Sequence, residues 1–203
     1  MHREDIEEKS QYEYEIIHGN NHILFIKTGL MGNIHGYKNR YIDIGKLINK
    51  KYGYSVYISR TLSTKMEDWD VDKTYIKNYV QQRNFSDYDI TFLGFSKGGV
   101  VGLLFATFEE KIGNIILINA PFMVNTEKII YEMRVLNDKF LTFVYTSFDT
   151  SHDYYKCLKE LESDKIKIVT IEGLNHNFRN YNEEIVRIIE EHLKNKSNEI
   201  ERV

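Results

Sequence analysis

The sequence predicts an α/β fold, a three-layer α/β/α sandwich around a mostly parallel sheet of about seven strands. Short apolar segments alternate with longer segments of helical periodicity along the chain. Most of the short segments are apolar throughout, which is typical of parallel strands covered on both faces. Such an alternation places helices on both sides of the sheet. At 203 residues, the chain is expected to form a single domain, residues 1–203.

Six short segments rich in β-branched or aromatic residues are predicted as buried strands. They are residues 23–27, 54–58, 90–95, 114–119, 140–146 and 166–171. Residues 12–17 alternate between polar and apolar side chains instead, which predicts a half-exposed, antiparallel edge strand. His18 and His22 are expected to flank a hairpin turn after that strand.

Helices are predicted where apolar residues recur at a spacing of three or four. The segments are residues 41–51, 72–83, 99–108, 127–136, 153–161 and 182–194. Residues 99–108 are apolar almost all round, which indicates a helix buried against the sheet. Ligands of such folds bind beyond the carboxyl ends of the strands, so chemistry is expected directly after each strand.

Composition excludes several classes of protein. The single cysteine, Cys157, cannot form an intramolecular disulfide, and the polar N-terminal residues 1–16 lack the apolar core of a signal peptide. No apolar segment is long enough to span a bilayer, so a cytoplasmic location is expected. A net charge of −3 gives no electrostatic case for binding nucleic acid. No metal-ligand spacing or dinucleotide motif is present, so neither a metal nor a cofactor is expected, and nothing indicates an oligomeric state.

Residues 94–99 read Gly-Phe-Ser-Lys-Gly-Gly and match the pattern G-x-S-x-G between a predicted strand and a predicted helix. In that context the pattern indicates a sharp turn that lifts the hydroxyl of Ser96 above the sheet. The turn also places this hydroxyl at the N-terminus of the next helix, where developing negative charge is favoured. Without catalysis, the same residues would form a glycine-rich turn capped by serine.

A nucleophilic serine needs a base, and the base needs a carboxylate to orient it. His176 lies just beyond the strand predicted at 166–171, and His35 and His152 also follow strands. Asp149 follows the strand predicted at 140–146, and Asp153 is the alternative, although it stands where a helix would begin and could serve as its N-cap. The preferred order along the chain is therefore Ser96, Asp149, His176.

With these segments, GFSKGG at 94–99, FVYTSFD at 143–149 and GLNHNF at 173–178, the sequence resembles the α/β-hydrolase family from about residue 12 to about residue 194. The resemblance implies a sheet of eight strands, of which one or both early strands would be missing or shortened here. It also implies an oxyanion hole formed by the backbone N–H groups of Lys97 and Leu30. Thr28 stands where the family commonly has histidine.

The resemblance further implies a serine hydrolase of carboxylesterase type, with a small-molecule ester, thioester or amide as substrate. Gly29 and Met31 of the same loop, and Phe122 and Met123 after the strand predicted at 114–119, are expected to line the substrate site. Only residues 120–139 separate two strands where larger members carry a lid, so any lid is expected to be minimal. The alternative is a non-catalytic binding protein on the same scaffold.

Overall fold

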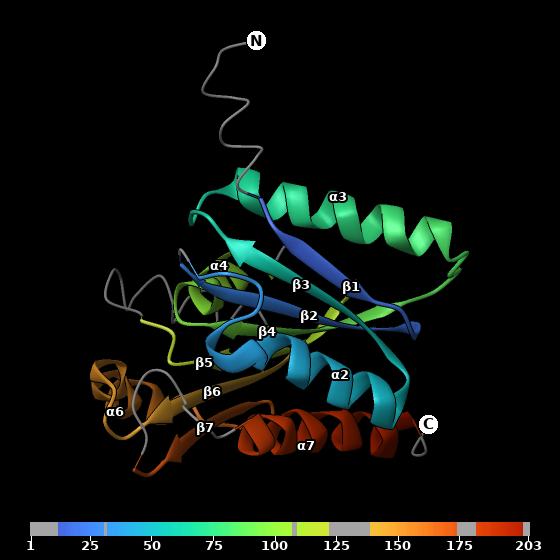
Figure 1. Ribbon diagram of the computed structural model, residues 1–203. Coiled ribbons are helices and arrows are strands. Elements are labelled where there is room, and N and C mark those ends of the chain that lie inside the picture. The colour runs from blue at the N-terminus through green and yellow to red at the C-terminus, as the bar shows by residue number, and fades with distance from the viewer. Residues whose placement is uncertain (1–11, 31, 107–108, 122–138, 174–181, 201–203) are drawn as a thin grey trace, which may run out of the picture.

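A single sheet of seven strands forms the centre of the molecule (Figure 1). The structure is a computed structural model and describes residues 12–30, 32–106, 109–121, 139–173 and 182–200. The strands are β1 (Tyr14–Ile17), β2 (Asn20–Leu30), β3 (Tyr54–Thr61), β4 (Asp89–Phe95), β5 (Ile112–Ile118), β6 (Phe140–Thr146) and β7 (Ile166–Ile171). Their order is β1-β3-β2-β4-β5-β6-β7, and only β1 pairs antiparallel with its neighbour. The predicted sheet is confirmed, including its antiparallel edge strand.

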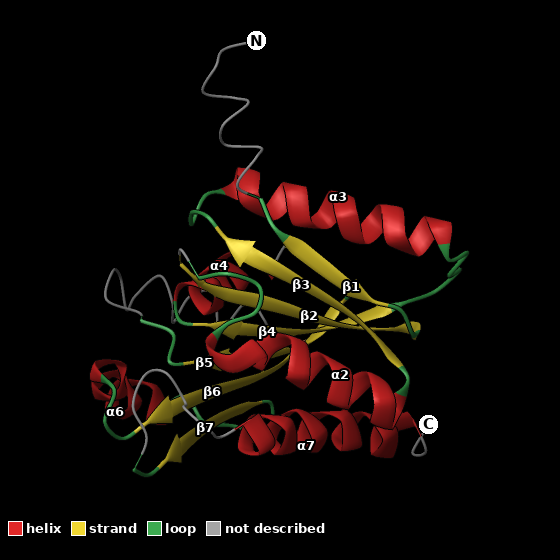
Figure 2. Ribbon diagram, in the orientation of Figure 1, coloured by secondary structure: helices red, strands yellow, loops and turns green. Residues whose placement is uncertain are grey.

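Helices cover both faces of this sheet (Figure 2). They are α2 (Arg40–Tyr52), α3 (Met66–Gln82), α4 (Lys97–Ala106), α6 (Tyr154–Lys159) and α7 (Asn182–Ile200), with short 3-10 turns η1 (Tyr37–Asn39) and η2 (Thr150–Asp153). Ile44 of α2 and Ile189 of α7 pack on one face of the sheet, whereas Trp69 of α3 and Leu103 of α4 pack on the other. The three-layer α/β/α sandwich is thereby confirmed.

Strand β2 shows how the sequence produces the two apolar layers. Its consecutive residues Ile23, Leu24, Phe25 and Ile26 are all buried, and they alternate between the two hydrophobic clusters. Successive side chains of a strand point to opposite faces, so an uninterrupted apolar segment serves both layers. The carboxyl ends of six parallel strands consequently meet at one edge of the sheet.

Two sequence expectations about local structure are wrong. Helix α3 begins at Met66, six residues before the expected start. Its first turn contains Glu67 and Asp68, and Trp69 is its one buried residue, so no apolar periodicity marks it in the sequence. Residues 18 and 19 do not form a hairpin turn, since β1 pairs with β3 and not with β2. Gly19 crosses the start of β3 so closely that a Cβ there would lie 2.4 Å from the carbonyl oxygen of Gly53. The helix expected at 127–136 lies outside the described residues.

His192 of α7 supplies a first prediction, on the pH dependence of folding. Burial, and to a lesser extent the charge of Lys167, lowers the pKa of His192 to about 4, and its ring hydrogen bonds to Thr142 of β6. The unfolded chain binds this proton near pH 6.5, so His192 should destabilise the fold as the pH falls from 6.5 to 4, by up to about 3 kcal/mol.

We expect His192→Gln, whose amide can still bond Thr142, to flatten the loss of unfolding free energy between pH 6.5 and 4. Urea denaturation at a series of pH values measures this. His35→Gln, at an exposed histidine, is the matched control and should keep the wild-type pH profile. A wild-type profile for His192→Gln would show that His192 is not held neutral in the folded state.

Candidate active site

Ser96 stands alone between strand β4 and helix α4 in a backbone conformation that L-residues rarely adopt. Its φ is 51°, in the left-handed region. The Ser96 N–H donates to the carbonyl of Ile118 at the end of β5, over 2.8 Å, and the Ser96 carbonyl accepts the N–H of Gly99 in the first turn of α4. Strain of this kind persists only where the surrounding structure imposes it, and it is frequent at functional sites.

The glycines around Ser96 are required by close packing. A Cβ on Gly98 would lie 2.2 Å from the carbonyl oxygen of Thr28, and a Cβ on Gly94 would lie 2.5 Å from the Cα of Gly99. Both distances are shorter than a Cβ can tolerate, so only glycine lets α4 and β2 approach the turn this closely. The G-x-S-x-G pattern therefore forms the sharp turn that the sequence predicts, and its glycines allow the close packing around that turn.

The carboxyl end of β2 lies beside Ser96. A Cβ on Gly29 would be 3.6 Å from the Cβ of Ser96, and the Gly29 carbonyl accepts the N–H of Gly32 over 3.0 Å. Leu30 is the last residue of β2, and 44% of its surface is exposed. Residues 28–30, which we call the β2 end segment, thus line the turn that carries Ser96.

Tyr41 of α2 also reaches this segment. Its ring packs edge-on against Phe95, which precedes Ser96, with 4.8 Å between ring centroids. Burial raises the pKa of the Tyr41 phenol above its ordinary value, although Arg40 and a backbone hydrogen bond with Gly29 oppose that shift. Tyr41 consequently presents a neutral phenol next to the β2 end segment.

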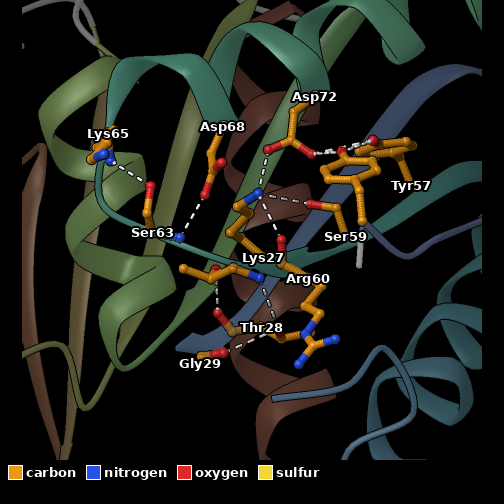
Figure 3. Close-up of polar contacts among 12 residues, drawn as sticks. Lys27, Thr28, Gly29, Tyr57, Ser59, Arg60, Ser63, Lys65, Asp68 and Asp72 are labelled. Carbon is orange, nitrogen blue, oxygen red and sulfur yellow. Dashed lines mark hydrogen bonds and ion pairs between the residues drawn. The ribbon is translucent and has the colours of Figure 1, made fainter. Parts of the chain in front are cut away.

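A buried charge cluster lies immediately before the β2 end segment (Figure 3). The Lys27 amine donates to the Asp72 carboxylate, to the Ser59 hydroxyl over 3.2 Å and to the Arg60 carbonyl over 3.1 Å. Tyr12 and Tyr57 hydrogen bond to the other carboxylate oxygen of Asp72. The cluster joins β2, β3, α3 and the residues that precede β1.

Asn119 and Thr146 tie together the carboxyl ends of β5 and β6. The Asn119 amide oxygen accepts the Thr146 N–H, and its amide nitrogen donates to the Thr146 hydroxyl, both over 3.0 Å. Asn119 has a φ of 44° and directly follows β5, whose Ile118 carbonyl binds the Ser96 N–H. A continuous set of hydrogen bonds therefore connects the turn of Ser96 to the end of β6.

Asp149 follows β6 and is 7% exposed. Its carboxylate accepts the N–H of Ser151 over 2.6 Å and so caps the 3-10 turn η2. Asp153, the alternative carboxylate, is exposed at the end of η2, and His152 donates its backbone N–H to the Asp149 carbonyl. Both aspartates follow β6 beyond its carboxyl end, but only Asp149 is buried.

The other predicted residues divide between the described and undescribed parts of the chain. Lys97 is the first residue of α4 and is half-buried, and His35 is exposed. His176, Met31, Phe122 and Met123 lie outside the described residues, as does most of the expected minimal lid. Gly173 is the last described residue before position 176, and its N–H donates to the Ser147 hydroxyl after β6 over 2.9 Å. The structure thus brings Ser96, Gly29, Leu30, Lys97 and Asp149 to one edge.

A protein-family model matches residues 75–179, just over half of the chain, and is described as "BAAT / Acyl-CoA thioester hydrolase C terminal". The chain belongs to this family. The matched segment runs from within α3 past β7, so it includes Ser96, Asp149 and position 176. No curated protein matches the sequence.

Solved structures show which fold this member of the acyl-CoA thioester hydrolase C-terminal family has. Est1E from Butyrivibrio proteoclasticus superposes with a TM-score of 0.67 at 14% identity, covering 92% of this chain and 95% of that one. The dienelactone hydrolase from Anabaena variabilis gives 0.66 at 12% identity, with 89% of each chain covered. A predicted CIB-like hydrolase from Thermoplasma acidophilum gives 0.64 at 17% identity, covering 91% and 93%. At these identities the likeness shows the fold, which is that of the α/β-hydrolases.

Sequence reasoning did not single out Thr61, whose hydroxyl donates to the Thr28 carbonyl, or Tyr41, and it assigned no role to Asn119. Thr61 ends β3, three residues beyond the predicted strand end, so the rule that chemistry follows strands did not reach it. Tyr41 was predicted only as part of a helix, and its contact with Gly29 depends on how α2 packs. In the described part of the chain, no helix is long and apolar enough to cross a membrane, and no three potential metal-ligating side chains cluster.

Proposed function

We propose that this protein is a serine hydrolase that cleaves carboxylic thioesters or esters through an acyl-Ser96 intermediate. The observation that carries the proposal is the left-handed backbone conformation of Ser96 at the tight turn between β4 and α4, next to the β2 end segment. Membership of an acyl-CoA thioester hydrolase family favours a thioester, and the structural similarity to Est1E, which has been solved with bound ferulic acid, is compatible with an ester. Amides remain a third substrate class for the same constellation.

In the first half-reaction, the Ser96 Oγ attacks the acyl carbonyl carbon while His176 takes the hydroxyl proton. The carbonyl oxygen becomes an oxyanion, held by the backbone N–H groups of Leu30 and Lys97. The oxyanion then collapses, the bond to sulfur or oxygen breaks, and His176 returns the proton to the leaving thiol or alcohol. Asp149 orients His176 throughout.

In the second half-reaction, water attacks the acyl-Ser96 ester and gives its proton to His176. The new oxyanion collapses, the carboxylic acid leaves, and His176 reprotonates Ser96. Lys97 is the first residue of α4, and the free N–H groups and dipole of a helix N-terminus favour negative charge there. This location supports Lys97 as a backbone donor, while its side chain is free to remain in solvent.

Hydrolysis of a graded substrate panel tests the proposal. Purified protein is incubated with acyl-CoA thioesters and with p-nitrophenyl esters of increasing acyl length, and the released thiol or p-nitrophenol is measured. We expect saturable turnover of at least one class, and the preferred chain length reports the depth of the acyl site. Tight binding of these acyl compounds without turnover of any of them would contradict catalysis and favour the binding-protein alternative.

The orienting carboxylate provides a matched pair of variants. Asp149→Asn is expected to lower kcat about 10³- to 10⁴-fold, because an amide no longer holds the histidine in the correct tautomer. Asparagine caps helices as well as aspartate does, so the η2 turn and the melting temperature should be preserved. Asp153→Asn, at the exposed alternative, should keep the wild-type kcat. Equal small losses in both variants would refute both assignments.

A further inference from the structure

The β2 end segment leaves the sheet through a bulge. Lys27 of β2 pairs with Ser59 of β3, but the next pair joins Leu30 to Thr61. Three steps along β2 therefore correspond to two steps along β3, and one residue of β2 is in excess. Bulges of this type redirect a strand and interrupt its ladder hydrogen bonds, and they are frequent beside active sites. Here the redirected residues are the ones that lie against Ser96.

Thr28 and Thr61 restore the hydrogen bonding that the bulge interrupts. The Thr61 hydroxyl donates to the Thr28 carbonyl over 2.6 Å, and the Thr61 N–H donates to the Thr28 hydroxyl over 3.3 Å. Both threonines are fully buried. Buried polar groups without partners are costly, so this reciprocal pair specifies one geometry for the bulge.

The same carbonyl that Thr61 binds also contacts the turn of Ser96. The Thr28 oxygen packs against the Cα of Gly98, where even one added carbon would approach to 2.2 Å. Gly29, the next residue, faces the Cβ of Ser96. A shift of Thr28 would therefore move the β2 end segment relative to Ser96, because the segment is in close van der Waals contact with the turn of Ser96.

We infer that Thr61 is a positioning residue, which acts through Thr28 to hold the Leu30 N–H at the place where the oxyanion forms. The inference rests on the proposed function and assigns to that site a residue on a strand that contributes no catalytic group. Oxyanion donors stabilise charge effectively when they are fixed in advance. A displaced donor therefore reduces the stabilisation of the transition state more than it reduces the affinity for the substrate. Thr61 should accordingly influence kcat rather than KM.

The test compares Thr61→Val, which keeps the shape and removes the hydroxyl, with Thr61→Ser, which keeps the hydroxyl. We expect Thr61→Val to lower kcat about 10-fold with KM nearly unchanged, and Thr61→Ser to restore most of the activity. Thr91→Val is the matched control, because Thr91 is buried on β4 near its amino end and bonds Asn114 instead. Thr28→Val removes the other hydroxyl of the pair and should act in the same direction.

Hydrogen exchange gives a readout that does not depend on activity. The amides of Gly29 and Leu30 should exchange faster in Thr61→Val than in wild type, Thr61→Ser or Thr91→Val. Unchanged exchange at these amides, or a kcat no lower than that of Thr91→Val, would overturn the inference. If wild-type protein hydrolyses no acyl substrate, the proposed function fails and the oxyanion role of Thr61 with it. Should Thr61→Val not fold, Thr28→Val decides by the same two measurements.

Discussion

Ser96→Ala is expected to lower kcat/KM at least about 10³-fold toward every thioester and ester that the wild-type protein hydrolyses. Ser96 is the residue at the tight turn between β4 and α4, so alanine there removes the proposed nucleophile. Alanine is strained in the left-handed region much as serine is, so the fold should be retained. Steady-state kinetics and the melting temperature measure the two effects separately.

A fluorophosphonate probe, which phosphonylates activated serines, identifies the nucleophile directly. Wild-type protein should be labelled stoichiometrically, and Ser96→Ala should not be labelled. Ser86→Ala is the control, because Ser86 is exposed in the loop before β4, at the opposite end of that strand. Labelling that persists in Ser96→Ala would mean that the nucleophile is another residue.

Lys27→Met is expected to cause the largest loss of stability, about 3 kcal/mol or more of unfolding free energy. It removes the cation from a pair whose two side chains have no exposed surface. Asp72 would then be a buried carboxylate without a counter-ion. Tyr12 and Tyr57 would still donate to it, since burial and the charge of Asp72 raise the pKa of both phenols and keep them protonated. Urea denaturation measures the loss.

The double variant Lys27→Met/Asp72→Asn determines whether uncompensated charge causes that loss. It should be more stable than Lys27→Met alone, because the remaining buried group is then neutral. Lys51→Met is the matched control: Lys51 pairs with Glu190 at the surface, and solvent screens that pair. A double variant less stable than Lys27→Met would show that packing, rather than charge, dominates at this position.

Much of the fold could be predicted from the sequence because local residue patterns specify most of its strands and helices. Strands β6 and β7 have the predicted bounds, and helix α7 begins at the predicted residue. A strand that is covered on both faces is apolar throughout. It can therefore be identified from its own residues, without knowing which strands lie beside it. The start of α3 was missed because its N-cap residue, Lys65, makes no side-chain capping bond, and the acidic first turn interrupts the apolar periodicity.

The site was partly predictable for the same reason. The strand-end rule located Ser96 and Asp149, since parallel strands bring their carboxyl ends to one edge. It could not choose between Asp149 and Asp153 by burial, which depends on how η2 folds back over β6. Whether His176 completes the group stays a prediction.

The sequence by itself determined the layer architecture and the strained serine turn, because both follow from periodicity and from glycines at fixed spacing. Only the tertiary structure decided that β1 pairs with β3, that Lys27 is buried with Asp72, and that Thr61 binds Thr28. Each of these joins residues at least 33 positions apart. Pairing at that distance depends on which strands become neighbours, and no local pattern of side chains encodes that choice.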